Sequence, residues 1–261
     1  SPWVSSYLTR HPILLDELLD ARELYAEPDW PALAAQLEQQ MAECGSDVEA
    51  KMDTRRHVQH AQQFRLVAQD LAGMWPLEAL SDQLSQLADM ILDATLRHAW
   101  QDVAKRHADT PRFAIIGYGK LGGKELGYVS DLDVIFLYED EHPDAADGYA
   151  RLARKLSAWI TSATPAGILY DLDLRLRPNG QSGLLVSTVE AFRQYQARDA
   201  WLWEHQALTR ARFVAGDAAI GDAFEKVRFE VLSQPRDLAA LRQEVLTMRA
   251  RMLETHPAQP D

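Results

Sequence analysis

Two short acidic segments contain the side chains whose types and spacing could support chemistry. Asp131 and Asp133 are separated by one residue, and a later segment contributes Asp171 and Asp173. Because side chains alternate between the two faces of a strand, the members of each pair are expected on one face. Carboxylates this close repel each other, and one tends to protonate unless a cation is bound. A pair of Mg²⁺ ions removes this conflict, because Mg²⁺ selects hard oxygen ligands.

A site with two metal ions suits displacement at phosphorus. One ion lowers the pKa of the acceptor oxygen, and the other neutralises charge on the phosphates and the leaving group. Asp131 and Asp133 therefore predict such a site, completed by a further carboxylate from an adjacent strand. Asp-x-Asp alone is common among solvated loop carboxylates, so the prediction depends on the motifs around it.

The later acidic segment alternates charge with leucine over residues 170–177. One face of a strand here would carry Asp171, Asp173, Arg175 and Arg177, and the other face would carry leucines suited to a core. Such a pattern is also typical of an exposed sheet face. Arg175 and Arg177 are candidate nucleotide-binding residues that would contact a triphosphate, but they would equally serve to balance the aspartates.

A glycine-rich loop precedes the first acidic pair, with five glycines between residues 117 and 127. Backbone N–H groups of such a loop can approach phosphate oxygens where a Cβ would clash. We predict Gly117, Gly119, Lys120 and Ser130 as nucleotide-binding residues. The spacing also matches the dinucleotide fingerprint, but Asp131 follows too soon for the helix and second strand which that fold requires. The Gly-Lys-Ser/Thr of a P-loop is missing.

The distribution of glycine divides the chain that must position these residues. Only two of the 13 glycines lie in residues 1–110, where apolar residues recur at helical spacing. We expect helices over residues 11–25, 30–44, 48–71 and around 80–94. We predict an α+β fold: a helical N-terminal region (1–110), a small mixed β-sheet nucleotidyltransferase core (111–216) and a helical C-terminal extension (217–261).

Short apolar runs predict the strands of the core. We expect strands at residues 113–116, 132–138 and 168–177, with a possible fourth at 184–186, and a helix around 149–160. The Pro-Asn-Gly at residues 178–180 predicts a turn. Beyond residue 188 the pattern predicts helix to the end of the chain.

Composition limits the partners. The net charge is −12, and residues 1–110 carry 9 Lys/Arg against 18 Asp/Glu, which argues against a nucleic-acid partner. No apolar run is long enough to span a membrane. The single cysteine, Cys44, excludes an internal disulfide and predicts a reducing, cytoplasmic setting and an inert thiol. The start, without Met or signal peptide, predicts a segment of a longer polypeptide.

The motifs together resemble those of glutamine synthetase adenylyltransferases, members of the DNA polymerase β-like nucleotidyltransferase superfamily. The resemblance is carried by Gly-Tyr-Gly-Lys-Leu-Gly-Gly-Lys-Glu-Leu-Gly-Tyr-Val-Ser-Asp-Leu-Asp-Val-Ile-Phe (117–136), by residues 167–180 and 203–212, and by the opening at 10–20. The superfamily pattern is a glycine pair followed by Asp-x-Asp, and Lys120 stands where Gly or Ser is usual.

The resemblance implies a function. Family members carry one domain that removes AMP from a glutamine synthetase tyrosine by phosphorolysis and one that attaches AMP from ATP. Residues 117–120 and 203–208 resemble the adenylylating half. The resemblance implies that Asp131, Asp133 and Asp173 are the catalytic residues and hold two Mg²⁺ ions, and that the PII signal protein regulates the full-length enzyme. The deadenylylating half and a non-catalytic nucleotide-binding module remain alternatives.

Overall fold

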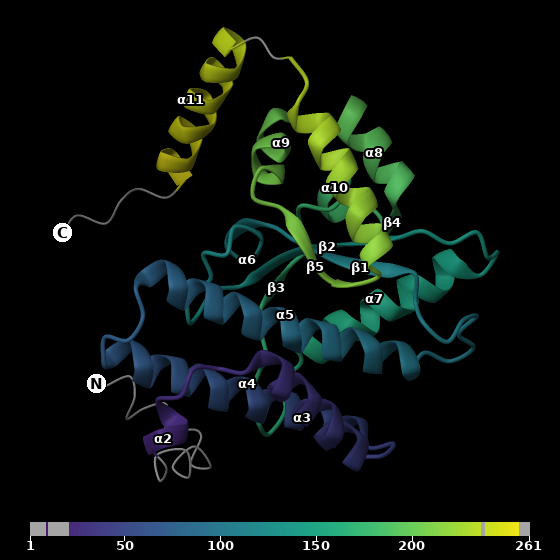
Figure 1. Ribbon diagram of the computed structural model, residues 1–261. Helices are drawn as coiled ribbons and strands as arrows, with labels where there is room; N and C mark the ends of the chain where they lie inside the picture. Colours follow the sequence, from purple (N-terminus) through teal and green to yellow (C-terminus); the bar gives the residue numbers. More distant parts are fainter. Residues whose placement is uncertain (1–8, 10–20, 236–237, 256–261) are drawn as a thin grey trace.

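A small β-sheet lies between layers of helices in the computed structural model, which describes residue 9 and residues 21–235 and 238–255 (Figure 1). The helices are α2 (Ala21–Leu24), α3 (Trp30–Glu43), α4 (Val48–Leu71), α5 (Leu77–Gln101), α6 (Gly119–Gly122), α7 (Ala145–Thr161), α8 (Val189–Arg198), α9 (Leu202–Leu208), α10 (Ala218–Leu232) and α11 (Leu238–Thr255), with a 3₁₀ turn, η2 (Gly180–Ser182). The strands are β1 (Phe113–Gly117), β2 (Leu132–Tyr138), β3 (Leu172–Asp173), β4 (Val186–Thr188) and β5 (Arg212–Gly216). The predicted α+β class is confirmed.

Local signals account for the first long helices. Asp29 caps α3 by accepting a hydrogen bond from the Ala32 N–H at 3.1 Å, and Asp47 caps α4 through the Ala50 N–H at 3.0 Å. The predictions for residues 30–44 and 48–71 are confirmed. The helix predicted over 11–25 lies largely outside the described residues. Of the helices that the structure describes, none is long and apolar enough to cross a membrane.

The sheet is mixed, with strand order β3-β2-β1-β5 and β4 paired to the other end of β2. β1 is antiparallel to both β2 and β5, whereas β3 and β4 run parallel to β2. β3 and β4 therefore share one side of β2, with β3 at its beginning and β4 at its end. This topology places the acidic residues of β2 and β3 side by side.

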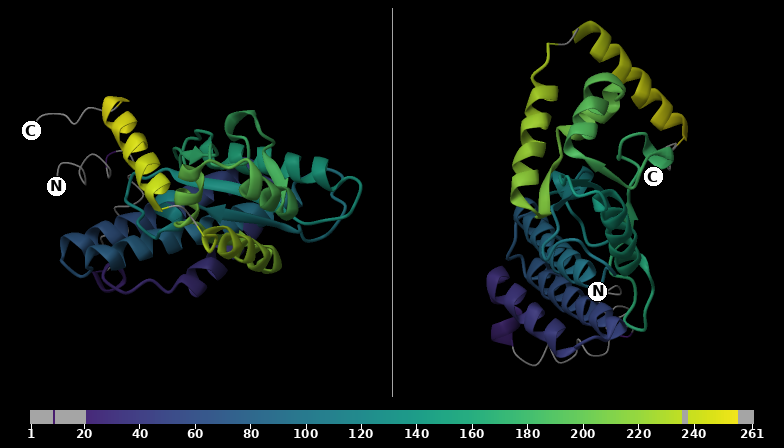
Figure 2. Two further views of the ribbon diagram at one scale, coloured as in Figure 1. Left: turned by 90° about the horizontal axis from the view of Figure 1, so that it is seen from above. Right: turned by 90° about the vertical axis from the view of Figure 1, so that its right-hand side faces the viewer.

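Alternate residues of the central strands pack into two separate cores. Phe113 and Ile115 of β1 join the core that contains residues of α5 and α7, whereas Ala114 and Ile116 join the core that contains residues of α8 and α10. Figures 1 and 2 show the corresponding helical layers on the two sides of the sheet. Because both faces of β1 are buried, its sequence is continuously apolar. This apolar run allows the strand to be predicted from the sequence without knowledge of the strands that pair with it.

Two strand predictions and one helix prediction need correction. The strand predicted over 168–177 is only Leu172–Asp173, because the Asp173 carboxylate accepts the Arg175 backbone N–H at 2.8 Å and turns the chain. The fourth strand covers 186–188 rather than 184–186. Residues 212–216 were predicted as helix but form β5, which pairs with β1.

The far end of β2 is fixed by hydrogen bonds to Asp140. Its Oδ2 lies 2.8 Å from His107 Nε2 and accepts from the Tyr149 hydroxyl at 2.7 Å, while Oδ1 accepts from the His142 N–H at 2.9 Å. Burial favours the neutral acid, but these bonds outweigh it and lower the pKa of Asp140 to about 2. The ionised carboxylate therefore joins β2 to α7 and to the segment before β1.

Asp140→Asn is expected to lower the free energy of unfolding at pH 7 by about 1.5–3 kcal/mol, the usual worth of hydrogen bonds to a charged group. The folded-state pKa lies below the ordinary value of 3.8, so this stability is present above pH 4 and is lost as the pH falls toward 2. Urea unfolding of both proteins at pH 7 and at pH 2.5 measures the difference. Equal destabilisation by the substitution at both pH values would contradict this account.

Candidate active site

The register of two parallel strands brings the predicted carboxylates together. Asp133 of β2 is paired with Asp173 of β3, and Asp131 immediately precedes β2. Val134 and Phe136 pack into the core with α5 and α7, so Asp133 points to the opposite face of the sheet. Adjacent strands lie about 4.8 Å apart, which places the Asp133 and Asp173 side chains next to each other.

Mutual repulsion is evident in the electrostatics of this cluster. The pKa of Asp133 is raised, first by burial and then by the charges of Asp131 and Asp173, while Arg175 and Lys120 act in the opposite direction. The three predicted carboxylates and two of the three predicted cations are therefore close enough to influence one another. A bound cation would stabilise the ionised form of Asp133 within this cluster.

Arg175 is bonded to Asp173. Its Nε donates to Asp173 Oδ2 at 2.7 Å, Nη2 donates to the same oxygen, and its backbone N–H donates to Oδ1. These hydrogen bonds lower the pKa of Asp173 despite partial burial. The Arg175 side chain is 71% exposed, so solvent surrounds most of the guanidinium. In this geometry Arg175 balances the charge of the acidic cluster.

The glycine-rich segment begins at the end of β1 and folds back over Asp133. Gly119 has a φ of +53°, and a Cβ added there would lie 2.1 Å from Asp133 Oδ2. The Tyr118 N–H donates to the Asp133 carbonyl at 2.8 Å, which fixes the turn against β2. Only glycine both adopts this backbone conformation and leaves room for the carboxylate.

Gly117 and Gly122 serve packing within the same turn. Gly117 is a buried residue of β1, and a Cβ there would lie 2.7 Å from Val214 Cγ2. A Cβ on Gly122 would lie 1.9 Å from the Arg210 carbonyl oxygen. The identity of Gly117 is thus explained by contact with β5, whereas Gly119 is the glycine that contacts the acidic cluster.

The other predicted nucleotide-binding residues have different surroundings. Lys120 is exposed on α6, beside the acidic cluster. The Ser130 hydroxyl accepts from the Gly127 N–H at 3.0 Å and closes the loop before Asp131. Arg177 donates to the carbonyls of Leu174 at 2.7 Å and Gln181 at 3.0 Å, so its guanidinium braces the turn after β3. Of these three, Lys120 is the side chain with a charge exposed beside the carboxylates.

Two of the three predicted carboxylates, Asp131 and Asp173, border an open hollow of about 400 Å³. It is lined by Asp131, Asp171, Leu172, Asp173, Leu174, Arg175, Arg177 and Gln181. Among the described residues, no three His, Cys, Asp or Glu side chains are already grouped closely enough to hold a metal ion. The donor set nevertheless fits Mg²⁺, because it consists of carboxylate oxygens, and the charges of Asp131 and Asp173 raise the pKa of Asp133, an effect that a bound cation would offset.

An ion pair absent from the sequence predictions supports the glycine turn. Arg212 of β5 forms two hydrogen bonds with Asp89 of α5, at 2.8 and 2.9 Å, and donates to the Leu121 carbonyl at 3.2 Å. Burial raises the pKa of Asp89, and the bonds to Arg212 oppose that shift. The available signal was the helical spacing of Asp89 relative to Ser85 and Leu92, which places a carboxylate on the buried face of α5.

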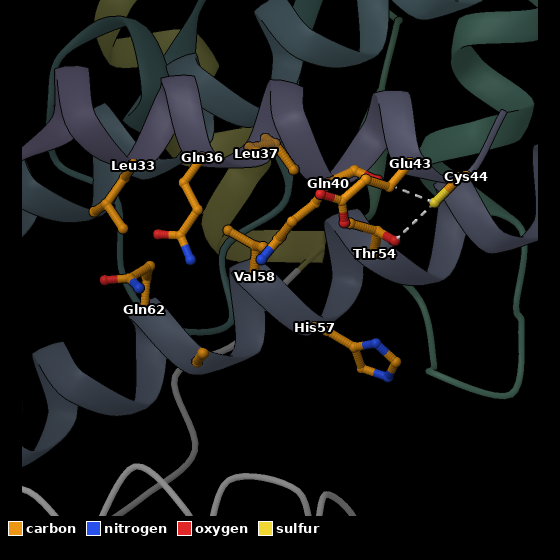
Figure 3. A pocket seen from close by; sticks show the side chains of 11 residues that line it. Leu33, Gln36, Leu37, Gln40, Glu43, Cys44, Thr54, His57, Val58 and Gln62 are labelled. Atoms are coloured by element: carbon orange, nitrogen blue, oxygen red, sulfur yellow. Dashed lines mark hydrogen bonds between the residues drawn. The ribbon is translucent and has the colours of Figure 1, made fainter.

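Another hollow, of about 510 Å³, lies between α3 and α4 (Figure 3) and is lined by none of the predicted site residues. Cys44, at its edge, is a free thiol whose Sγ donates to the Gln40 carbonyl at 3.2 Å and lies 3.5 Å from Thr54 Oγ1. The sulfur is therefore bonded within the helical region and away from the acidic cluster.

Comparisons with known proteins identify the family of the chain. The sequence model of the family described as glutamate-ammonia ligase adenylyltransferase matches residues 1–227. Proteins named bifunctional glutamine synthetase adenylyltransferase/adenylyl-removing enzyme from Chromobacterium violaceum and Neisseria meningitidis serogroup B are 73% and 58% identical over 258 and 257 residues. These matches cover 99% and 98% of this chain but 29% of each relative. The chain belongs to the glutamate-ammonia ligase adenylyltransferase family.

Proposed function

We propose that this chain transfers AMP from ATP to a tyrosine hydroxyl of glutamine synthetase and releases diphosphate. The observation that carries the proposal is the parallel register of Asp133 with Asp173 beneath the Gly119 turn. The names of the relatives supply the substrate and the transferred group. The resemblance of residues 117–120 and 203–208 to the adenylylating half favours this direction of the reaction.

Asp131, Asp133 and Asp173 are the residues that would hold two Mg²⁺ ions. When bound, these ions supply charge neutralisation for the triphosphate and lower the pKa of the acceptor hydroxyl. The approach of the Gly119 backbone to Asp133 keeps that carboxylate at the base of the glycine turn. We propose Gly117, Gly119, Lys120 and Ser130 as the nucleotide-binding segment on the opposite side of the acidic cluster from Arg175.

The chemistry requires the residues of the chain to orient two reactants. The tyrosyl oxygen gives its proton to water and bonds to the α-phosphorus, and the bond from that phosphorus to the bridging oxygen breaks as diphosphate leaves. Lys120 presents a mobile cation for the phosphates. Arg175 balances the charge of Asp173 in this geometry. Its side chain is exposed enough to turn toward the triphosphate when a bound cation neutralises Asp173 instead. Arg177 acts by holding the turn between β3 and η2.

Several partners belong to the same proposal. ATP is the nucleotide substrate, and glutamine synthetase is the protein substrate. The PII signal protein is the regulator proposed for the full-length enzyme, of which this chain spans less than a third if it is built like its relatives. A cytoplasmic location is consistent with one free cysteine in 261 residues.

The test is the intact mass of unmodified glutamine synthetase after incubation with this chain, ATP and Mg²⁺. A mass gain of one AMP per modified subunit is expected, and it should disappear when ATP or Mg²⁺ is left out. No gain with protein that is folded and binds ATP would overturn the proposal.

The relatives' names include an adenylyl-removing activity, so removal of AMP is measured in a second, parallel experiment. Adenylylated glutamine synthetase is incubated with the chain, phosphate and Mg²⁺. Loss of AMP in this arm, without gain in the first, would identify the deadenylylating half. Nucleotide binding without change of mass in either arm would identify a non-catalytic module.

A further inference from the structure

Helix α4 contacts both of the segments that lead into the acidic cluster. Near the middle of the helix, Gln63 Nε2 donates to the Tyr128 carbonyl at 3.1 Å. Near its end, Asp70 Oδ2 accepts from the Tyr128 hydroxyl at 2.9 Å. Tyr128 lies three residues before Asp131, so α4 holds the loop that precedes the first carboxylate pair.

Near the beginning of α4, Arg56 reaches the segment between α7 and β3. Its Nε donates to the Gly167 carbonyl at 2.7 Å, and Nη2 donates to the carbonyls of Trp159 at 3.1 Å and Ser162 at 2.5 Å. Nη1 donates to Met52 within the helix at 2.8 Å. Arg56 is 0% exposed, and every nitrogen of its guanidinium is bonded to a backbone carbonyl. Three of these bonds connect residues more than 100 positions apart.

The position of these carbonyls explains why an arginine is needed. Trp159 and Ser162 are at the C-terminal end of α7, where helix carbonyls lack partners within the helix and the dipole favours a cation. Gly167 closes a turn with Thr164 through bonds of 3.0 and 2.9 Å and has a φ of +103°. A planar guanidinium satisfies three separated acceptors at once, which a single ammonium cannot do with the same geometry.

The segment held by Arg56 continues directly into β3, and further contacts fix the residues between them. Leu169 is buried among Leu37, Met41, Leu87 and Ile91 of the helical region. The Tyr170 N–H then donates to the Ile160 carbonyl, and the Leu132 N–H donates to the Asp171 carbonyl at 2.9 Å. Figure 1 shows this connection from α7 to β3 running past α4 and α5.

We infer that Arg56 is a positioning residue for the acidic cluster: it fixes the end of α7 and the turn at Gly167, and thereby the path of the chain to Asp173. This inference rests on the proposed function for its catalytic consequence. The helices before residue 110 then form part of the catalytic unit, because α4 fixes the chain segments that precede both Asp131 and Asp173.

Arg55 offers a matched control in the adjacent position. It is also 0% exposed on α4, and its guanidinium lies 4.8 Å from the centre of the Trp159 ring. Its three guanidinium nitrogens have no hydrogen-bond partner among the residues that the structure describes. Arg55→Met and Arg56→Met therefore remove the same buried charge from the same helix, but only the second removes the bonds to the backbone before β3.

The experiment measures amide hydrogen exchange over residues 162–173 and Mg²⁺ binding by calorimetry, with no turnover required. Arg56→Met is expected to speed exchange in this segment at least about tenfold and to weaken Mg²⁺ binding about 10–100-fold, as loss of a supporting contact does at metal sites. Arg55→Met is expected to leave both unchanged, although its melting temperature shifts. Arg56→Lys, which retains the charge, is the variant to compare if Arg56→Met does not fold, and it should fall between wild type and Arg56→Met.

A folded Arg56→Met or Arg56→Lys protein with wild-type exchange and Mg²⁺ affinity would overturn the inference. Faster exchange in Arg55→Met of the same size would also overturn it, because the effect would then be general to buried charge in α4. If the wild-type chain binds no Mg²⁺, the metal site proposed above fails, and the exchange comparison alone decides the role of Arg56.

Discussion

Asp133→Asn is expected to lower the rate of AMP transfer by at least roughly 10²–10³-fold, the loss seen when one preorganised electrostatic contact is removed. Asparagine keeps the size of the side chain but removes the charge that would hold a cation between β2 and β3. The measurement is the rate of mass gain of glutamine synthetase at saturating ATP and Mg²⁺. Retention of more than about a third of the wild-type rate would contradict the assignment of Asp133.

The same substitution is expected to raise the melting temperature in the absence of metal. The pKa of Asp133 is raised in the folded state by burial and by Asp131 and Asp173, so its ionised form opposes folding at pH 7. Asparagine relieves that repulsion. A gain in stability together with a loss of activity distinguishes a functional carboxylate from a structural one.

A matched control removes one charge from the end of the same strand. Glu139→Gln changes an exposed carboxylate that follows β2 at the edge away from the acidic cluster. Its rate should equal that of the wild type. Mg²⁺ should raise the melting temperature of the wild type and of Glu139→Gln, because a ligand that binds the folded state stabilises it, and should leave Asp133→Asn unchanged.

Gly119→Ala is expected to reduce AMP transfer about 10²-fold, the cost of a misplacement of about 1 Å in an active site. A Cβ at residue 119 would lie 2.1 Å from Asp133 Oδ2 and 2.9 Å from its carboxyl carbon, so the carboxylate must move. The positive φ of +53° adds about 1–2 kcal/mol of backbone strain for a residue with a side chain. The kcat for transfer and the midpoint of urea unfolding measure the two effects separately.

Gly127→Ala is the comparison within the same loop. Among the described residues, a Cβ there would meet only the Ser130 hydroxyl, at 3.4 Å, which is ordinary contact. Near-wild-type activity is expected for Gly127→Ala. If both alanine variants lost activity equally, the loss would reflect general stiffening of the glycine-rich loop, and the contact between Gly119 and Asp133 would not explain it.

The acidic cluster was predictable from the sequence because its signals are local. Asp131 immediately precedes a strand, and Asp133 lies within it among residues that are otherwise apolar. The five glycines mark the turn before this strand. Helices α3 and α4 were likewise predictable, since aspartate caps and apolar spacing act within a few residues. The family resemblance then singled out Asp173 over Asp171.

Features that depend on distant partners were decided by the tertiary structure. β5 exists because Arg212–Gly216 pairs with β1 about 100 residues earlier, and its mostly half-buried residues, which do not alternate between buried and exposed, carry little signal on their own. β3 ends at Asp173 because that carboxylate accepts a hydrogen bond from the backbone N–H of Arg175. This side-chain hydrogen bond competes with pairing to the sheet, and the charge pattern of the sequence does not reveal it. The residue types and spacing of the sequence determined which groups can do chemistry here. Their arrangement depends on hydrogen bonds from Arg56 and Arg212 to backbone more than 90 residues away, and no local pattern encodes such bonds.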